Sequence, residues 1–135
     1  MNTFILQTKL YGDPVEPGYN FGYSVSVGQS TLAVGSVGYT DEELGVFVLG
    51  SVFIFDHTSE GWIQTSRIQP GGITSSDYFG YSVGIDNNWL VVGAPYAKSQ
   101  TGAAYLFHRT NATSPWLGDS VLVQRDAQNL TSGAK

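Results

Sequence analysis

The chain contains one pentapeptide twice, and this repeat constrains the fold more than any other feature of the sequence. The sequence FGYSV occupies residues 21–25 and again residues 79–83, so that the two copies begin 58 positions apart. A Val-Gly pair ends an apolar run at the same spacing, at 34–35 and at 92–93. Similarity at a period of about 50 residues is typical of repeat architectures, in which each copy is one supersecondary unit. We therefore expect a fold built from repeated units.

Each copy of the repeat is expected to form four short strands. Residues 21–27 alternate large apolar side chains with Gly and Ser, and residues 79–85 do the same, which indicates strands with one small face that a neighbouring backbone can approach closely. The next strands are almost wholly apolar, which indicates burial on both faces. The predicted strands are 21–27, 31–35, 50–56, 62–68, 79–85, 89–93, 102–108 and 116–124.

Four antiparallel strands that recur every 50-odd residues form the blade of a β-propeller. The predicted fold is therefore all-β, a partial propeller of about two four-stranded blades plus one extra outer strand, with no helix beyond a turn. The expected division of the chain is 1–20 as the outer strand of a preceding blade (4–10) with a connecting loop, 21–68 as the first blade, 69–124 as the second blade and 125–135 as a flexible tail.

The alternation also predicts which side chains are buried. Large residues of the first strand and apolar residues of the second and third strands should form the core of each blade. The predicted core is Phe21, Tyr23, Val25, Leu32, Val34, Phe53, Phe55, Phe79, Tyr81, Val83, Leu90, Val92, Tyr105 and Phe107.

Composition and charge exclude several classes of function. The formal net charge is −5 and the 6 Lys and Arg residues are scattered, which argues against a nucleic-acid partner. No apolar run approaches the roughly 20 residues of a membrane helix, so no membrane insertion of this segment is expected. The first residues do not resemble a signal peptide. The sequence has no Cys, which removes thiol catalysis and Cys-based metal centres.

Several elements of the repeat form an ordered series: Phe79-Gly80, Gly93-Ala94-Pro95, the strand 102–107, and the residues Trp62 and Trp116 that open the outer strands. With this series the sequence resembles the FG-GAP repeat family, which builds the propellers of integrin α subunits and of many bacterial and protist surface proteins. The resemblance covers roughly residues 4 to 123, and it implies blades with an innermost Phe-Gly strand and an outermost Trp strand in a ligand-binding or adhesion protein. The first copy departs mildly, with Gly35-Ser36-Val37 at the second element.

Many integrin-type repeats hold calcium in an acidic loop between these elements, but the corresponding turns here are too poor in carboxylates. They span residues 28–31 and 86–89 and contain one acidic residue, Asp86. A hard cation takes six to eight oxygen ligands, several of them carboxylates. We therefore expect no metal site in these turns and no cofactor.

Candidate binding residues gather in loops that should lie at one end of the blades. Loops 36–49 and 94–101 join second to third strands, and loops 11–20 and 69–78 lead from one blade to the next; together they should form one rim. Its tyrosines suit contact with protein or sugar, or else cap the loops against the blade edge. Its acidic run is either a cation or basic-ligand site or a solvated loop tip. The candidate ligand-binding residues are Tyr39, Asp41, Glu42, Glu43, Tyr96, Tyr19 and Tyr78.

Other polar residues carry weaker indications. His57 and His108, with Asp56 and Arg109 beside them, do not coincide when the copies are aligned, and a surface position is the favoured interpretation. The triplets at Asn111 and Asn129 are either glycosylation acceptors or chance matches.

The sequence favours a non-enzymatic module that binds a protein ligand in cell adhesion, outside the cell or at its surface as part of a larger protein. The alternatives are a carbohydrate-binding, lectin-like propeller and a scaffold domain of a larger surface protein or enzyme. No nucleophile motif, phosphate loop or spaced carboxylate pair suggests catalysis. Two blades alone leave apolar faces bare, so the expected partners also include further blades from a longer chain, or self-association.

Overall fold

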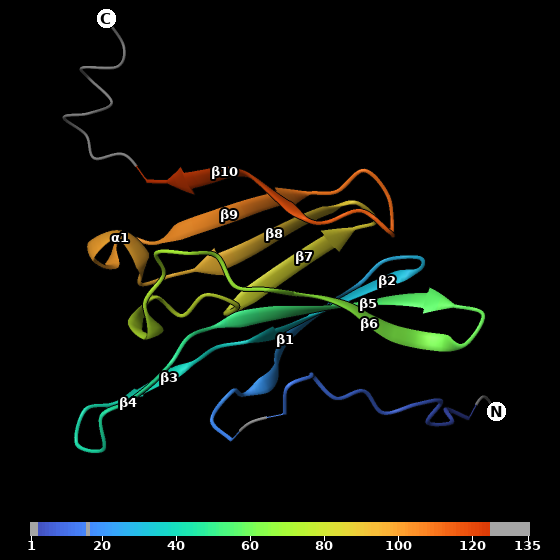
Figure 1. The fold of residues 1–135 in the computed structure, drawn as a ribbon, viewed down its shortest axis with the longest axis horizontal. Helices are drawn as coiled ribbons and strands as arrows, with labels where there is room; N and C mark the ends of the chain where they lie inside the picture. Colours follow the sequence, from blue (N-terminus) through green and yellow to red (C-terminus); the bar gives the residue numbers. More distant parts are fainter. Residues whose placement is uncertain (1–2, 16, 125–135) are drawn as a thin grey trace, which may run out of the picture.

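The structure is a computed structural model that describes residues 3–15 and 17–124, and it confirms the all-β class (Figure 1). It contains two four-stranded sheets, each antiparallel throughout, which we call the first and the second blade. The tail predicted at 125–135 lies outside the described residues.

The strand order in each blade follows the chain, so that the Phe-Gly strand lies at one edge of the sheet and the Trp strand at the other. The first blade has the order β1-β2-β5-β6 and the second the order β7-β8-β9-β10. The bounds are β1 Phe21–Val27, β2 Thr31–Ser36, β5 Ser51–Thr58, β6 Gly61–Ile68, β7 Ser82–Asp86, β8 Trp89–Ala94, β9 Ala103–His108 and β10 Leu117–Val123. Each predicted strand of the two blades is present, displaced by at most three residues at an end.

The loop predicted at 36–49 contains a hairpin that the repeat did not indicate. Its strands are β3 (Tyr39–Asp41) and β4 (Val46–Val48), which pair Tyr39 with Val48. In the described residues, helical structure is limited to single turns, η1 (Ser75–Asp77) and α1 (Ala97–Gln100). Within α1, Lys98 and Ser99 have φ values of 53° and 57°, which a right-handed helix cannot continue through.

The Phe-Gly element adopts the same backbone turn in both blades. Asn20 and Tyr78 have φ values of 53° and 60°, and the glycines two positions later, Gly22 and Gly80, both have φ of 94°. Glycine adopts such a conformation without steric strain, which explains its place in both copies of the pentapeptide. Residues 58 positions apart in the sequence, such as Gly22 and Gly80, therefore have equivalent backbone conformations.

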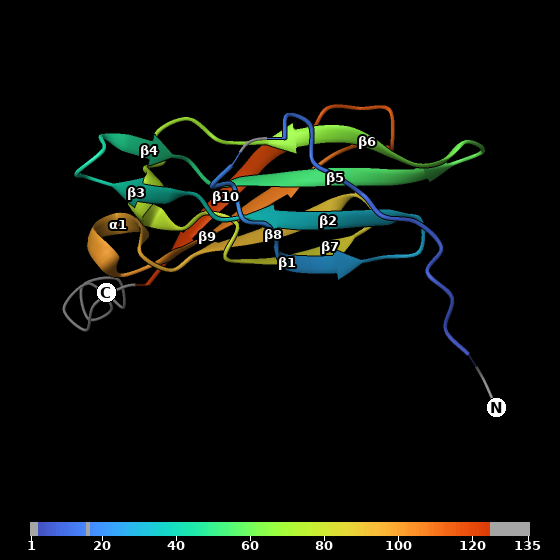
Figure 2. The same ribbon diagram turned by 90° about the horizontal axis from the view of Figure 1, so that it is seen from below.

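The two blades meet along their Phe-Gly strands, where β1 contacts β7 (Figure 2). The small side chains predicted to admit a neighbouring backbone do so. Ser24 Oγ donates to the carbonyl oxygen of Gly80 at 2.7 Å, and the backbone N–H of Ile85 donates to Ser26 Oγ at 3.1 Å. The small face of β1 is thus the contact surface for the second blade.

Two glycines at equivalent positions provide a test of this contact. A Cβ atom on Gly35 would overlap the Gly80 carbonyl oxygen of the other blade, whereas a Cβ atom on Gly93 would overlap only the Ser82 hydroxyl of its own blade. We expect Gly35→Ala to lower the free energy of unfolding by about 1–3 kcal/mol, because backbone must move, and Gly93→Ala to lower it less. Urea unfolding of both variants measures the difference, and equal losses would contradict this view of the junction.

The core is divided into a cluster between the blades and a smaller one on the outer face of the first blade. The first includes Ile54 of β5 together with Phe79 and Leu90 of the second blade, all fully buried. The second contains Val34, Phe53 and Phe55 and is partly covered by Leu10, Tyr19 and Phe21. Both clusters therefore have a Phe-Gly phenylalanine against aromatic residues of the third strand.

Three residues predicted to be core are in fact exposed, and for these the prediction is wrong. Tyr23 is 51 % exposed, Val25 is 65 % exposed and Tyr81 is 42 % exposed. Val25 pairs with Val34 on the face of the first blade that points away from the second, so no sheet of the described structure covers it. Of the other predicted core residues, Phe21, Leu32 and Val83 are half-buried and the remaining eight are buried.

The strand expected at residues 4–10 is also absent from the structure. This segment contains no strand, and Phe4, Ile5 and Leu6 are 99 %, 85 % and 81 % exposed. A strand requires a neighbour to satisfy its backbone groups, and no strand of the described residues pairs with this one. Its assignment to a preceding blade stays a prediction.

Candidate functional site

Four tyrosines form two neighbouring ring pairs at the end of the blades where the Phe-Gly strands begin. The rings of Tyr23 and Tyr81 have centroids 5.1 Å apart and are tilted by 50°. The rings of Tyr78 and Tyr96 have centroids 5.0 Å apart and lie edge to face at 87°. The cluster draws on both blades and on two loops, and we call it the tyrosine cluster.

Local hydrogen bonds fix the two loop tyrosines. Tyr78 ends the η1 turn, in which Asp77 Oδ1 accepts from Thr74 Oγ1 at 2.8 Å. The backbone N–H of Tyr96 donates to the carbonyl oxygen of Asp77 at 3.2 Å, and that of Tyr81 donates to the carbonyl oxygen of Tyr78 at 3.0 Å. The η1 turn therefore ties both loop tyrosines to the start of the second blade.

The tyrosine cluster is partly exposed to solvent. Its members are between 38 % and 51 % exposed. The hydrogen bond with Tyr81 raises the pKa of Tyr23, and burial and the neighbouring tyrosines raise it further. The cluster thus offers flat apolar rings with hydroxyl groups as donors and acceptors, a combination suited to binding.

The structure separates the tyrosines that the sequence placed on one rim. Tyr78 and Tyr96 are in contact, whereas Tyr19 packs on the outer core of the first blade, with the Arg67 guanidinium 5.5 Å from its ring centroid. Tyr39 is half-buried in β3, and its ring lies against Gly18 of the preceding loop. Tyr23 and Tyr81 were missed as candidate binding residues because their alternation was interpreted as burial. The glycine before each of them is the sequence signal that could have found them, since glycine readily adopts the positive φ that interrupts a regular strand.

The acidic run lies at the β3–β4 hairpin turn. Asp41 Oδ1 accepts from the backbone N–H of Leu44 at 3.0 Å, and Glu42 and Glu43 are exposed. Among the residues described, no group of three or more His, Asp or Glu side chains is placed to hold a metal ion.

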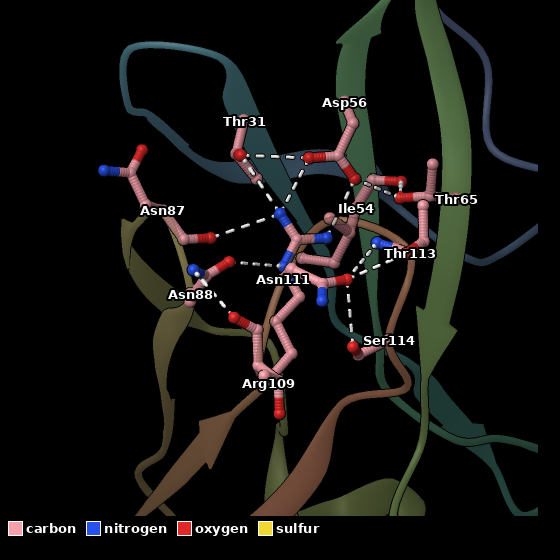
Figure 3. A network of polar contacts seen from close by, with 11 residues as sticks. Thr31, Ile54, Asp56, Thr65, Asn87, Asn88, Arg109, Asn111, Thr113 and Ser114 are labelled. Carbon is pink, nitrogen blue, oxygen red and sulfur yellow. Dashed lines mark hydrogen bonds and ion pairs between the residues drawn. The ribbon is translucent and has the colours of Figure 1, made fainter.

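A second polar site lies between the blades and is built around a buried ion pair (Figure 3). Arg109, which follows β9, donates from Nη2 to Asp56 Oδ1 at 2.7 Å and from Nη1 to Asp56 Oδ2 at 2.9 Å. Their side chains are 2 % and 7 % exposed. The pair joins the third strand of the first blade to the end of the third strand of the second.

The remaining hydrogen-bonding capacity of the pair is used within the site. Asp56 also accepts from the Thr31 and Thr65 hydroxyls, and Arg109 also donates to Thr31 Oγ1 and to Asn87 and Asn88. Burial by itself raises the pKa of the Asp56 carboxyl, but the bonds from Arg109, Thr65 and Thr31 outweigh it, so the pKa lies below its ordinary value. With its groups paired, the site is suited to holding the blades together.

Asp56 and Arg109, which the sequence showed only as neighbours of His57 and His108, therefore belong to a buried site. Both are buried because the residue after β9 reaches across the junction to the first blade. The histidines beside them are more accessible. His57 is exposed and lies 5.0 Å from the Trp62 ring, and His108 is half-buried.

Of the two glycosylation candidates, Asn111 lies in an exposed turn after β9. Its side-chain oxygen accepts from the backbone N–H of Thr113 at 3.0 Å and from the hydroxyl of Ser114. Asn129 lies outside the described residues.

The fold and the paired Phe-Gly turns define a protein of β-propeller repeats, and a comparison with family models identifies the type. The FG-GAP repeat model matches residues 62–107, from the outer strand of the first blade through most of β9. The match confirms, over this segment, the resemblance to FG-GAP repeats noted in the sequence. No curated protein matches the chain. In the part of the chain that the structure describes, no helix is long and apolar enough to cross a membrane.

Proposed function

We propose that this chain is a non-enzymatic module that binds a protein ligand through the tyrosine cluster. The observation that supports the proposal is the convergence of four half-exposed tyrosine rings from two blades and two loops. Tyrosine provides a large rigid contact area at a small loss of side-chain entropy, and it is enriched among the residues that dominate protein interfaces.

A protein ligand fits the cluster better than a glycan. The edge-to-face contact of Tyr78 with Tyr96 covers part of a ring face that a sugar would need for stacking. The hydroxyl groups at the ring ends remain suited to hydrogen bonds with a polypeptide. In this proposal the module acts in adhesion outside the cell, where Asn111 in its exposed turn is an acceptor for a glycan.

The proposal predicts a separation of binding from stability. Tyr78→Ala and Tyr96→Ala should each weaken the ligand by about 1–3 kcal/mol, the range of a buried aromatic contact, and should barely change the melting temperature. Binding is measured on arrays of extracellular proteins and of glycans, followed by titration of the ligand found. Tyr11→Ala is the matched control, because Tyr11 is 61 % exposed and makes no ring contact with the cluster.

Three results would refute this function. The first is a ligand whose affinity is the same for Tyr96→Ala and Tyr11→Ala. The second is binding to glycans alone, which would favour the lectin-like alternative. The third is a large loss of stability with intact binding, which would make the loop tyrosines structural caps.

A further inference from the structure

Each blade has one face over which no second sheet packs in the described structure, and both faces carry exposed apolar side chains. On the first blade, Val25 and Val27 are 65 % and 67 % exposed. On the second, Trp89 and Val91 are 44 % and 41 % exposed, and Leu122 is 56 % exposed. We call these the first free face and the second free face.

The second free face is the counterpart of the surface with which the first blade holds the second. Strand pairing places Ser82 beside Gly93 and Gly84 beside Val91 on this face. In the first blade the equivalent positions are Ser24 beside Gly35 and Ser26 beside Ala33, which form the junction with β7. The second blade therefore presents the equivalent positions with no sheet packed on them. Ser82, Gly84 and Gly93 are small there, and the larger Val91 stands in place of Ala33.

The first free face is in turn the counterpart of the surface that the second blade brings to the junction. In the junction, the Phe79 ring lies 5.2 Å from Tyr105 and 6.3 Å from Phe107. On the first free face, the Phe21 ring lies 5.3 Å from Phe53 and 6.2 Å from Phe55. The two aromatic clusters have the same geometry, yet only one has a sheet packed over it.

The equivalence extends to the polar end of the junction. The backbone N–H of Arg109 donates to the carbonyl oxygen of Asn88 at 3.0 Å, and that of His57 donates to the carbonyl oxygen of Ser30 at 2.9 Å. Arg109 lies over the Trp116 ring at 4.6 Å, as His57 lies against Trp62. His57 therefore occupies in the first blade the position that Arg109 occupies in the second.

The position of Asp56 has its own counterpart in the second blade. Asp56 of β5 pairs with Thr31 of β2, and at the equivalent position of the second blade His108 of β9 pairs with Trp89 of β8. His108 is therefore the counterpart of Asp56. The rings of His108 and Trp89 have centroids 4.2 Å apart. A surface equivalent to the internal junction would therefore bring His57 opposite His108.

We propose that a second copy of this chain docks head to tail, with the second free face of one copy on the first free face of the other. One chain carries both halves of the contact, so a second copy completes either face without any other polypeptide. Such a contact is heterologous, and repetition of it produces a ring where the rotation closes.

The contact between copies reproduces part of the internal junction. The Ser82 hydroxyl of one copy can donate a hydrogen bond to the carbonyl oxygen of Gly22 in the other copy. This bond is the counterpart of the one that Ser24 Oγ donates to Gly80 in the internal junction. Gly84 stands in place of Ser26 and has no hydroxyl to accept the hydrogen bond that Ser26 accepts from the backbone N–H of Ile85. His57 opposite His108 also forms no equivalent of the ion pair between Arg109 and Asp56. At the outer edge, Leu10 already packs on the first free face. The contact is therefore apolar and weaker than the internal one.

Mixing two variants tests this arrangement directly. Val25→Asp introduces a charge on the first free face and Val91→Asp one on the second, both at exposed positions that tolerate a polar side chain. The wild type should show a mass that rises with concentration in analytical ultracentrifugation, and each variant alone should stay monomeric. The equimolar mixture should form a 1:1 dimer and nothing larger, because each variant keeps one intact face. Leu44→Asp, at a 75 % exposed position of the β3–β4 turn, is the control and should assemble as the wild type does.

A graft of the ion pair provides a second test. His57→Arg with His108→Asp places the two charges of the internal junction on opposite sides of the contact between copies. The double variant should associate at least about tenfold more tightly than the wild type, since charge pairs at interfaces couple strongly, and either single variant should not.

The outcomes that overturn the proposal are distinct. A wild type and a double variant that are both monomeric at every concentration would exclude a second copy as the occupant. Loss of assembly in Val25→Asp but not in Val91→Asp would show an isologous contact instead. Either result leaves the tyrosine cluster and the proposed function untouched, because they involve other residues.

Discussion

Replacement of Asp56 by Ala is expected to lower the free energy of unfolding by about 3–5 kcal/mol, because it leaves a guanidinium buried without its partner. Arg109 is 2 % exposed and directs two of its nitrogens at the lost carboxylate. Urea unfolding measures the change. Asp86→Ala is the matched control. Asp86 is exposed at the end of β7, so its replacement should lower the free energy of unfolding by well under 1 kcal/mol.

A double substitution distinguishes the charge from the packing. Asp56→Leu combined with Arg109→Met removes both charges at similar volume and should recover most of the loss, since apolar replacement of a buried pair is often neutral. If the single variant loses less than about 1 kcal/mol, the pair does not hold the blades together, and the junction depends on its apolar contacts alone.

The lowered pKa of the Asp56 carboxyl predicts how the free energy of unfolding depends on pH. Because the pKa of Asp56 is lower in the folded chain than its ordinary value of 3.8, its contribution is complete above that value. It is lost as the pH falls from there through the lower, folded-state pKa. Unfolding measured at several pH values from neutral downward should show this loss in the wild type, and a shallower one in Asp56→Ala.

Phe79→Ala is expected to have an effect of similar size, about 3–5 kcal/mol, because it leaves a cavity between the blades. The Phe79 side chain is completely buried and packs edge to face on Tyr105 and Phe107. Urea unfolding again measures the loss. Its repeat counterpart provides the control: Phe21 makes the same ring contacts but is only half-buried, so Phe21→Ala should lose clearly less. Equal losses would show that the sheet packed over Phe79 adds nothing to its stability.

The strands of both blades could be predicted from the sequence, because their alternation and spacing are local properties that recur. Burial could not be predicted as well, because it depends on what covers a face. Val25 and Val83 occupy the same place in the repeat, yet Val25 is 65 % exposed while Val83 packs against the core between the blades. The alternation identifies the faces of a strand, and the neighbouring sheet determines which of them is buried.

The polar site between the blades could not be predicted for a related reason. Asp56 and Arg109 are not equivalent residues of the repeat, so comparing the two copies does not pair them. They meet because Arg109 reaches across the junction from the end of β9. Likewise, half of the tyrosine cluster was predicted as loop residues and half as core, since Tyr23 and Tyr81 follow the alternation of buried positions.

The ion pair of the junction also has a consequence for the order of the repeats. The carboxylate is carried by the earlier unit and the guanidinium by the later one, and neither unit carries both at the matching positions. Exchanging the two units along the chain would separate the charges and bring two histidines together in their place. Units that look alike in sequence are therefore not interchangeable, and only the native order forms the ion pair.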